Sequence, residues 1–345
     1  MIDIETLSRR ALRYGLEHQI ERDCWEKGPL LSAAVAYGDD DDRALASAWM
    51  RRAIATQRSN GNLGYADSVQ GMTAGHIRGF TPLASLTSSL GYPLLLSHQQ
   101  RPDPTFFAAA ARQIEALRQA PRTRDGGIWA RAEHPELWID FTYLMAPFLA
   151  LYGRLAGDAL AIDEAYHQFI VHAEHLLDAR KQLARHAWCE QPDHYPQSTF
   201  WARGNGWLIC AAVDLLEIAP QHASAEQVRR TLKSVLEAMS TYQETSGYFC
   251  HVLDDPHSNL EASSTLMYAH AATRAITLGV VDRAMLPSAQ RALAAVAGAV
   301  EPSGKVPGVA MVPGGPGVPF DWTVFGQAFF VLAHHSLKPF AGAGV

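Results

Sequence analysis

Helical periodicity runs through almost the whole chain, and no other feature of this sequence restricts its fold so strongly. Apolar residues recur three and four positions apart, as in Leu232, Val235 and Met239, which places them on one face of a helix. Stop signals follow the periodic segments, such as Gly157 after one and Gly279 after another. The pattern predicts twelve helices: Ile4–Cys24, Pro29–Tyr37, Asp41–Gln57, His76–Leu90, Thr105–Arg118, Ile139–Ala156, Ala159–Leu177, Gly206–Ile218, Ala225–Tyr242, Glu261–Leu278, Asp282–Ala299 and Trp322–Leu337.

The links between these helices are of two kinds, because short connections alternate with long segments rich in Gly, Pro, His and Trp. The long segments are Gly61–Gly75, Pro121–Trp138, Ala184–Asn205 and Ser303–Asp321. Long connections in compact proteins are usually functional. We therefore expect an all-α fold, a single domain over residues 1–345 in which six helical hairpins close into an (α/α)6 barrel with a cleft on its long-loop side. An open α-solenoid would show a regular repeat, and the sequence has none.

Composition excludes several classes of function. The formal charge of −6, without a basic stripe, argues against nucleic-acid binding. No apolar run approaches the ~20 residues that cross a bilayer, and residues 1–5 carry acids where a secretory signal would be basic, so we expect no membrane partner and a cytoplasmic location. The four cysteines lack metal or redox spacing and are expected to be reduced and buried: Cys24, Cys189, Cys210 and Cys250.

The segment Trp201–Trp207 reads Trp-Ala-Arg-Gly-Asn-Gly-Trp and combines side chains suited to an acidic sugar. Indole faces cover flat apolar surfaces such as the C–H face of a sugar ring. The guanidinium of Arg203 offers a rigid fork of donors that matches a carboxylate. The segment thus predicts an acidic-sugar site. An Asn-Gly turn with two core tryptophans and a structural arginine is the alternative.

Asp140 is the lone acid at the start of the most apolar helix, since no charge occurs from Phe141 to Tyr152. A carboxyl group in such surroundings can keep its proton near neutral pH, as a general acid must; a helix N-cap is the alternative role. His186, in a long loop, can orient a substrate carboxylate or a water, or is simply solvated. No His-x-x-x-His or phosphate-loop motif is present, so neither a catalytic metal nor a nucleotide is predicted.

The order of these segments along the chain resembles a known family. From about Gly61 to the C-terminus it is similar to the unsaturated rhamnogalacturonyl hydrolases, glycoside hydrolase family 105, which are related to the unsaturated glucuronyl hydrolases of family 88. The segments that carry the resemblance are Trp138–Asp140 with Tyr143–Phe148, His186–Trp188, Trp201–Trp207, Ser246–Asp254 and Glu261–Ser264.

The resemblance implies an (α/α)6 barrel that removes a 4,5-unsaturated uronic acid from lyase-generated oligosaccharides. An aspartic acid, here Asp140, protonates the vinyl ether at C4, water adds at C5, and the resulting hemiketal collapses without any cofactor or metal. It also implies that Arg203 binds the uronate carboxylate. The other residues placed at the substrate are His76, Trp138, His186, Trp201 and Trp207.

The chain departs from the family at one early helix, where an aspartate is usually followed shortly by glycine. Here the segment Gly75–Gly79 has His76 in the matching position, and Asp67 is the nearest upstream acid. Two alternatives remain open at the level of sequence. One is another (α/α)6 carbohydrate enzyme, either an inverting glycosidase or an epimerase; the other is a non-catalytic helical module that binds acidic glycans.

Overall fold

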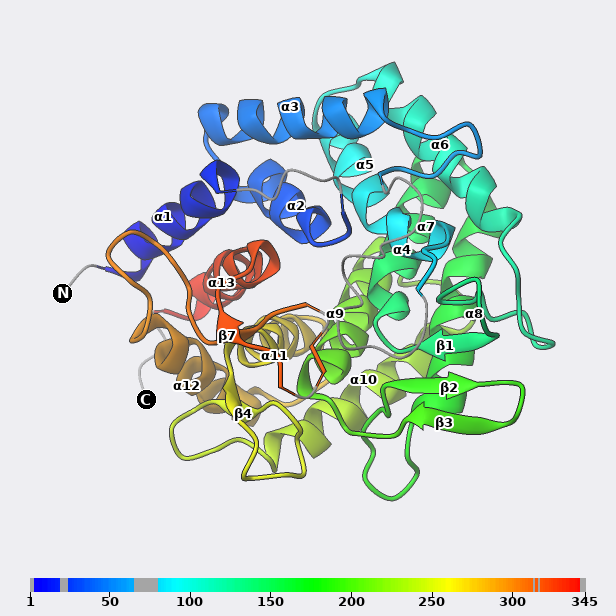
Figure 1. Ribbon diagram of the computed structural model, residues 1–345. Coiled ribbons are helices and arrows are strands. Elements are labelled where there is room, and N and C mark those ends of the chain that lie inside the picture. Colours follow the sequence, from blue (N-terminus) through cyan, green and yellow to red (C-terminus); the bar gives the residue numbers. More distant parts are fainter. Residues whose placement is uncertain (1–2, 19–23, 65–79, 313, 316, 342–345) are drawn as a thin grey trace.

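The computed structural model describes residues 3–18, 24–64, 80–312, 314–315 and 317–341, and these are predominantly helical (Figure 1). The α-helices are α1 (Ile4–Glu17), α2 (Lys27–Tyr37), α3 (Asp40–Ala55), α4 (Ala84–Thr87), α5 (Gly91–Gln100), α6 (Pro104–Arg118), α7 (Phe141–Ala156), α8 (Ala159–Leu176), α9 (Ala202–Ile218), α10 (Ala225–Ser240), α11 (Ala262–Thr277), α12 (Leu286–Ala297) and α13 (Val324–Leu337). Short 3-10 helices are η2 (Ser88–Leu90), η3 (Arg283–Met285) and η4 (Lys338–Phe340).

Six of these helices form a closed ring. Around it, α2 packs on α5, α5 on α7, α7 on α9, α9 on α11, α11 on α13, and α13 again on α2. An outer helix packs on each member: α3 on α2, α6 on α5, α8 on α7, α10 on α9, α12 on α11 and α1 on α13 (Figure 1). The predicted (α/α)6 barrel is confirmed.

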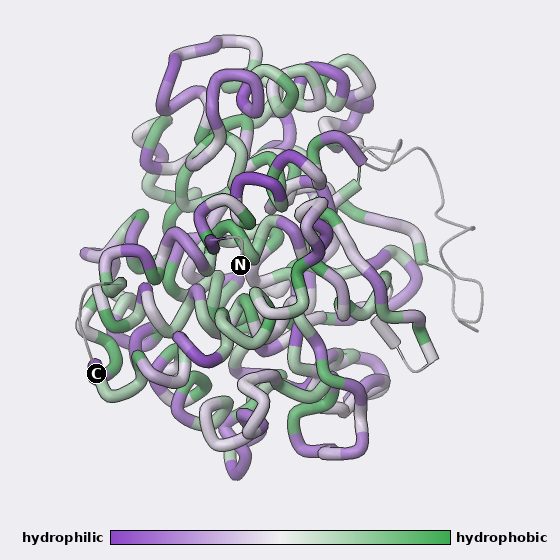
Figure 2. The backbone as a smooth tube through the Cα atoms, turned by 90° about the vertical axis from the view of Figure 1, so that its left-hand side faces the viewer, coloured by the Kyte–Doolittle hydropathy of each residue, from purple (hydrophilic) through white to green (hydrophobic). Residues whose placement is uncertain are grey.

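The distribution of apolar residues explains which helices lie inside. The inner helix α7 carries one charged residue, Arg154, in its last turn, so most of its surface can be buried. The outer helix α10 buries one stripe that includes Leu232 and Leu236 and exposes Arg230 and Glu237 on the other side, as an amphipathic surface helix does. Figure 2 shows hydrophilic and hydrophobic residues alternating along such peripheral helices.

Seven short strands lie in the links that precede inner helices. They are β1 (Glu136–Trp138), β2 (Ala187–Cys189), β3 (His194–Gln197), β4 (Phe249–Cys250), β5 (Leu260–Glu261), β6 (Val309–Ala310) and β7 (Phe320–Asp321) within the described residues. They form an antiparallel sheet β1-β2-β3 and two hairpins, β4-β5 and β6-β7. Because α7, α9 and α13 begin directly after these strands, three of the predicted long links gather at one end of the barrel: Pro121–Trp138, Ala184–Asn205 and Ser303–Asp321. Most of the fourth, Gly61–Gly75, lies outside the described residues.

The helix predicted over His76–Leu90 is wrong in its bounds. Residues 65–79 lie outside the described part of the chain, and beyond them the structure has α4, η2 and then α5, which runs on to Gln100. Gly91 and Pro93 stand where a helix would end, but both lie in the first turn of α5, where a proline is tolerated. A Cβ at Gly91 would lie 2.5 Å from the Phe148 ring, so tertiary packing explains this glycine.

The four cysteines are buried, as predicted, and none of them is part of a disulfide within the described residues: Cys24, Cys189, Cys210 and Cys250. None of the helices in the described part of the chain combines the length and apolar character needed to cross a membrane.

Candidate active site

Asp140 precedes the first residue of α7 but does not cap this helix. Its side chain makes no hydrogen bond to the N–H groups of the first turn. Instead, Oδ2 lies 3.1 Å from Nε2 of His186, and the two side chains are 16% and 11% exposed. The alternative role as a helix cap is therefore wrong, and the carboxyl group belongs to an acid–histidine pair.

His186 is held from two sides by the β1-β2-β3 sheet. Its Nδ1 is hydrogen-bonded to the side-chain oxygen of Gln197 at the end of β3, and its carbonyl accepts the N–H of Ile139 at 3.0 Å. Because Nδ1 faces an oxygen, the neutral ring carries its lone pair on Nε2, next to Asp140. His186 is thus a fixed, mostly buried partner of Asp140 and not a solvated loop residue.

The segment Gly204–Gly206 is helical, so the Asn-Gly turn, which was the alternative for this segment, is wrong. Helix α9 begins at Ala202, four residues earlier than predicted. A Cβ at Gly204 would lie 2.8 Å from Cγ2 of Ile139, and one at Gly206 would lie 2.6 Å from the sulfur of Met267. These glycines let the start of α9 approach the segment of Asp140 on one side and α11 on the other.

Asn205 ties the loop that carries His186 to α9. Its fully buried side chain accepts the N–H of Ala184 at 2.7 Å and donates to the carbonyl of Ala184 at 3.0 Å. Nδ2 also donates to the carbonyl of Trp201 at 3.0 Å. Since Ala184 lies two residues before His186, this amide sets the position of the histidine relative to Trp201.

Trp201 and Arg203 lie beside this acid–histidine pair. The Trp201 and His186 ring centroids are 4.8 Å apart, and the guanidinium carbon of Arg203 lies 4.5 Å from the Trp201 ring centroid. Arg203 is 1% exposed; its Nη1 donates to the carbonyl of Ala310 at 2.8 Å and lies 3.4 Å from Oε1 of Glu261. Burial lowers the pKa of Arg203, while the charges of Glu261 and Asp140 oppose that shift.

The other two tryptophans occupy different positions. Trp138 is partly exposed, stacks on Phe80 at 5.5 Å between ring centroids, and lies 5.5 Å from the His186 ring. Trp207 is 1% exposed and packs against the rings of Tyr143 and Phe329, with centroids 4.9 and 5.4 Å away. In this arrangement Trp138 has an exposed surface that a ligand can contact. Trp207 has none, and it packs in the core behind the site. His76 and Asp67 lie outside the described residues.

Unpaired buried polar atoms mark the same place in the barrel. Within the described residues, nine buried side-chain nitrogen and oxygen atoms have no hydrogen-bond partner. Four of them belong to this one group of neighbouring side chains: Trp201 Nε1, Arg203 Nε, His251 Nδ1 and Asp140 Oδ2. The last lies 3.1 Å from His186 Nε2 but forms no hydrogen bond with it. Buried polar atoms without a hydrogen-bond partner are rare in proteins, and each one calls for an explanation. A polar ligand that forms hydrogen bonds with these atoms would be a direct explanation.

Three residues of the site were not predicted from the sequence. Gln197 carries no sequence signal, because a lone glutamine in a loop is unremarkable. Glu261 and His251 stand in segments that support the family resemblance, but no local pattern assigns either residue to the site. Nε2 of His251 donates to the carbonyl of Gly314 at 2.9 Å, and its ring centroid is 6.3 Å from that of Trp201. Burial lowers the pKa of His251, which favours its neutral form.

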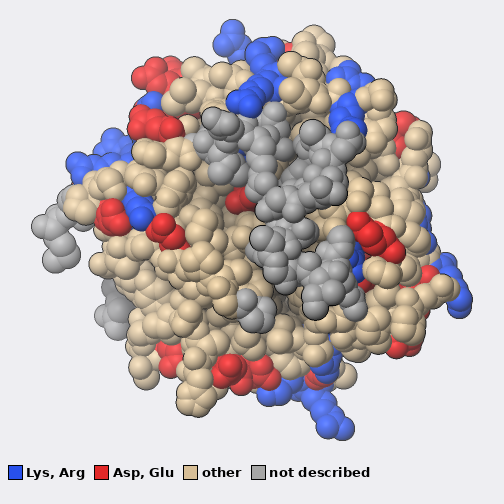
Figure 3. Space-filling model, in the orientation of Figure 1, with Lys and Arg blue, Asp and Glu red and all other residues tan. Residues whose placement is uncertain are grey.

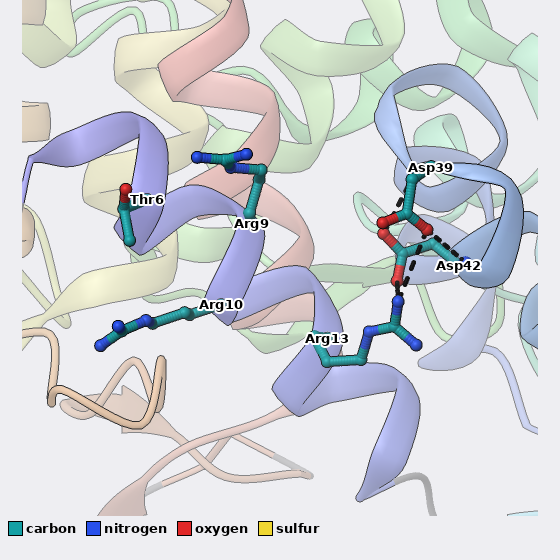
Figure 4. A pocket seen from close by; sticks show the side chains of 6 residues that line it. All are labelled: Thr6, Arg9, Arg10, Arg13, Asp39 and Asp42. Carbon is teal, nitrogen blue, oxygen red and sulfur yellow. Dashed lines mark hydrogen bonds and ion pairs between the residues drawn. The ribbon is translucent and has the colours of Figure 1, made fainter.

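A surface hollow elsewhere on the molecule does not share this chemistry. It measures about 300 Å³ and lies between α1 and the start of α3. Figure 4 shows Arg13 reaching from α1 toward Asp39 and Asp42, with Arg9 and Arg10 beside it. It is an exposed cluster of ion pairs without an aromatic side chain.

The described residues contain no cluster of three or more His, Cys, Asp or Glu side chains arranged to hold a metal ion. On the face shown in Figure 3, lysines and arginines lie mostly around the rim.

A six-hairpin barrel with an acid–histidine pair beside an indole and a buried arginine, at the end that carries the long loops, defines the class of (α/α)6 carbohydrate-active enzymes. Within this class, the chain belongs to Glycosyl Hydrolase Family 88, whose family model matches residues 12–340. The chain is therefore a glycosidase, and the family relationship predicted from its motifs is confirmed.

Comparisons with individual proteins agree with this assignment. The chain is 29% identical over 238 residues to the unsaturated rhamnogalacturonyl hydrolase YesR of Bacillus subtilis, covering 66% of this chain and 67% of YesR. A possible family 105 member from Salmonella enterica serovar Paratyphi A has the same fold, with a TM-score of 0.85, 21% identity and coverage of 98% and 94%. The unsaturated glucuronyl hydrolase of Bacillus sp. GL1 superposes with a TM-score of 0.72 at 14% identity, covering 98% of this chain and 95% of that one.

Proposed function

We propose that this protein removes a 4,5-unsaturated uronic acid from the non-reducing end of an oligosaccharide, with Asp140 as general acid and base. The observation that carries this proposal is the placement of Asp140. At the start of a helix it makes no capping bond, lies 3.1 Å from His186, and is grouped with Trp201 and Arg203. Membership of family 88 and the activity named for YesR support the substrate class.

The chemistry needs one proton donor and one water. Asp140 transfers its proton to C4 of the C4=C5 double bond, and the positive charge at C5 is shared with the ring oxygen. Water adds to C5 and returns a proton to the Asp140 carboxylate, which regenerates the acid. The hemiketal then opens to a ketone at C5 and a hemiacetal at C1, which breaks down to an aldehyde and releases the remaining sugar as an alcohol.

The surrounding residues take roles that follow from their contacts. His186, held by Gln197, keeps the Asp140 carboxyl group in position through its Nε2 at 3.1 Å. Arg203 binds the uronate carboxylate, and Trp201 and Trp138 flank the sugar. Trp207 supports this pocket from the core, where it is 1% exposed. His76 remains a proposed substrate contact on the strength of the family resemblance alone.

An inverting glycosidase, which needs two carboxylates about 6.5–9.5 Å apart across the scissile bond, fits less well. Two other buried acids of this region are already engaged. Glu136 pairs with Arg131 at 2.7 Å and accepts the indole N–H of Trp138 at 2.8 Å. Glu261 accepts the N–H of Ser264 at 2.6 Å and pairs with Arg203.

Asp140→Asn tests the proposal. The variant should lose nearly all of the decay in absorbance near 235 nm that accompanies turnover of an unsaturated disaccharide. Its melting temperature should stay close to that of the wild type, because Asp140 makes no capping bond. Asp158→Asn is the matched control: Asp158 caps a different helix, α8, a role that asparagine also fills, so this variant should keep its activity. Near-normal turnover by Asp140→Asn would contradict the assignment.

A further inference from the structure

Two buried arginines of this protein use their guanidinium groups in opposite ways. Arg131 presents its Nε and Nη2 edge to Glu136, with donor–acceptor distances of 3.0 and 2.7 Å. Arg203 instead uses Nη1, which donates to Ala310 and lies near Glu261. In Arg131, the Nε–Nη2 edge of the guanidinium holds a protein carboxylate. Arg203 does not use its Nε–Nη2 edge to hold a protein carboxylate.

The free edge of Arg203 has the geometry that a carboxylate needs. Nε is buried and has no hydrogen-bond partner, and Nη2 donates no hydrogen bond to any described residue. Nε–H and the adjacent Nη2–H run parallel, so together they match the two oxygens of one carboxylate. A buried, unpaired donor destabilises the protein, and a ligand carboxylate would remove that cost.

The contacts of Glu261 explain how the position of the Arg203 guanidinium is fixed. It is fully buried at the start of α11, where it accepts the N–H of Ser264 at 2.6 Å and the hydroxyl of Ser263 at 2.8 Å. It also accepts the N–H of Ala310 at 3.0 Å, while Arg203 donates to the carbonyl of the same residue at 2.8 Å. The Arg203–Glu261 pair therefore forms hydrogen bonds with both the backbone N–H and the carbonyl of Ala310, and it connects α9, α11 and β6.

Gly314 lies against the guanidinium near Nη2. A Cβ at Gly314 would lie 2.5 Å from Arg203 Nη2 and 2.7 Å from Cζ2 of Trp201, and the backbone φ of +85° itself favours glycine. His251 holds this glycine through its hydrogen bond to the carbonyl. Any side chain here would push the guanidinium away from its observed position.

We propose that Glu261 is a positioning residue for carboxylate recognition: it engages Arg203 through Nη1 and so reserves the Nε–Nη2 edge for the carboxylate of the uronic acid. This inference rests on the proposed function, because the ligand carboxylate is that of the unsaturated uronide. Glu261 does not contact the substrate. Its effect on the enzyme is the orientation of Arg203, and therefore the preference for an acidic over a neutral sugar.

The experiment compares one unsaturated uronide as the free acid and as its methyl ester, which cannot form the paired ionic contact. The wild type should prefer the acid in kcat/KM. In Glu261→Gln this preference should fall about tenfold, equivalent to about 1.4 kcal/mol, through a higher KM for the acid, with kcat and the ester little changed. Asp158→Asn is the control, since Asp158 also caps a helix and pairs with an arginine, Arg118, at 2.5 Å. It should leave the preference unchanged.

Two further variants make the outcome decisive. Arg203→Lys should lose the preference as well, and adding Glu261→Gln to it should cause no additional loss. If Glu261→Gln does not fold, Gly314→Ala displaces the same guanidinium from the other side and should lower the preference in the same way. An unchanged preference in the folded variant would overturn the inference, as would equal turnover of acid and ester by the wild type. Absence of turnover of either compound by the wild type would instead overturn the proposed function.

Discussion

The effects of Asn205→Ala on stability and on activity follow directly from the contacts of this side chain. The side chain is fully buried and pairs with both the N–H and the carbonyl of Ala184. Alanine leaves these two backbone groups without their partner. At about 1–3 kcal/mol for each unsatisfied buried group, we expect a loss of about 3 kcal/mol in the free energy of unfolding.

The expected shift in melting temperature follows from the size of the protein. With an unfolding entropy of about 2.1 cal/mol/K per residue and 345 residues, a loss of about 3 kcal/mol lowers the melting temperature by about 4 °C. Activity should fall more sharply, because Ala184 positions the loop of His186. A displacement of a catalytic partner by about 1 Å can cost on the order of a hundredfold in rate.

Calorimetry and the 235 nm assay measure the two effects on the same samples. Asn259→Ala is the matched control, since Asn259 is exposed, and it should change neither quantity. A variant Asn205→Ala that melts within 1 °C of the wild type and turns over substrate at the normal rate would refute the reasoning. It would show that the bridge to Ala184 neither stabilises the barrel nor positions His186.

Three further predictions concern stability and catalysis. Burial lowers the pKa of His270 to about 4, below its unfolded value near 6.5, so its contribution to stability is complete above pH 6.5 and is lost as the pH falls toward 4; melting temperatures from pH 7 to pH 4.5 should fall less steeply in His270→Gln. Gln197→Leu removes the partner of His186 and should lower kcat at least tenfold with little change in KM, measured by initial rates. Gly204→Ala should lower kcat, because its Cβ would lie 2.8 Å from Ile139 Cγ2, and Ile139 precedes Asp140.

Each of these predictions has a contrary outcome. Identical pH dependence of melting in His270→Gln and the wild type would show that His270 is not the group that titrates. Normal kcat in Gln197→Leu would show that His186 is held without this hydrogen bond. Gly206→Ala is the control for Gly204→Ala, since its Cβ would meet the flexible side chain of Met267, and equal kcat values for the two variants would contradict the link between Gly204 and Asp140.

Much of the architecture is predictable because helices are local. Hydrophobic periodicity over ten to twenty residues located the elements that became α6, α8 and α10 to within a few residues, and the alternation of short and long links indicated the barrel. The errors arose where tertiary contacts replace local signals. The helix predicted over Ile4–Cys24 ends at Glu17, and α9 starts within what reads as a turn.

The identities of the central residues were also visible in the sequence, but their functions within the site were not. Asp140 has the residue type and position of a helix cap, and only its surroundings show that it faces His186. Trp207 is as good a stacking residue in the sequence as Trp201, yet the structure buries it among other rings.

By itself, the sequence determined the helical barrel, the end of it that carries the site, and the acid, histidine and arginine that meet there. Only the tertiary structure decided how those groups are oriented. Arg203 meets Glu261 and Ala310 across 58 and 107 residues of chain, and no local pattern encodes contacts at such separations. Closure of the ring of inner helices brings these segments together, and their packing leaves one edge of the Arg203 guanidinium unpaired.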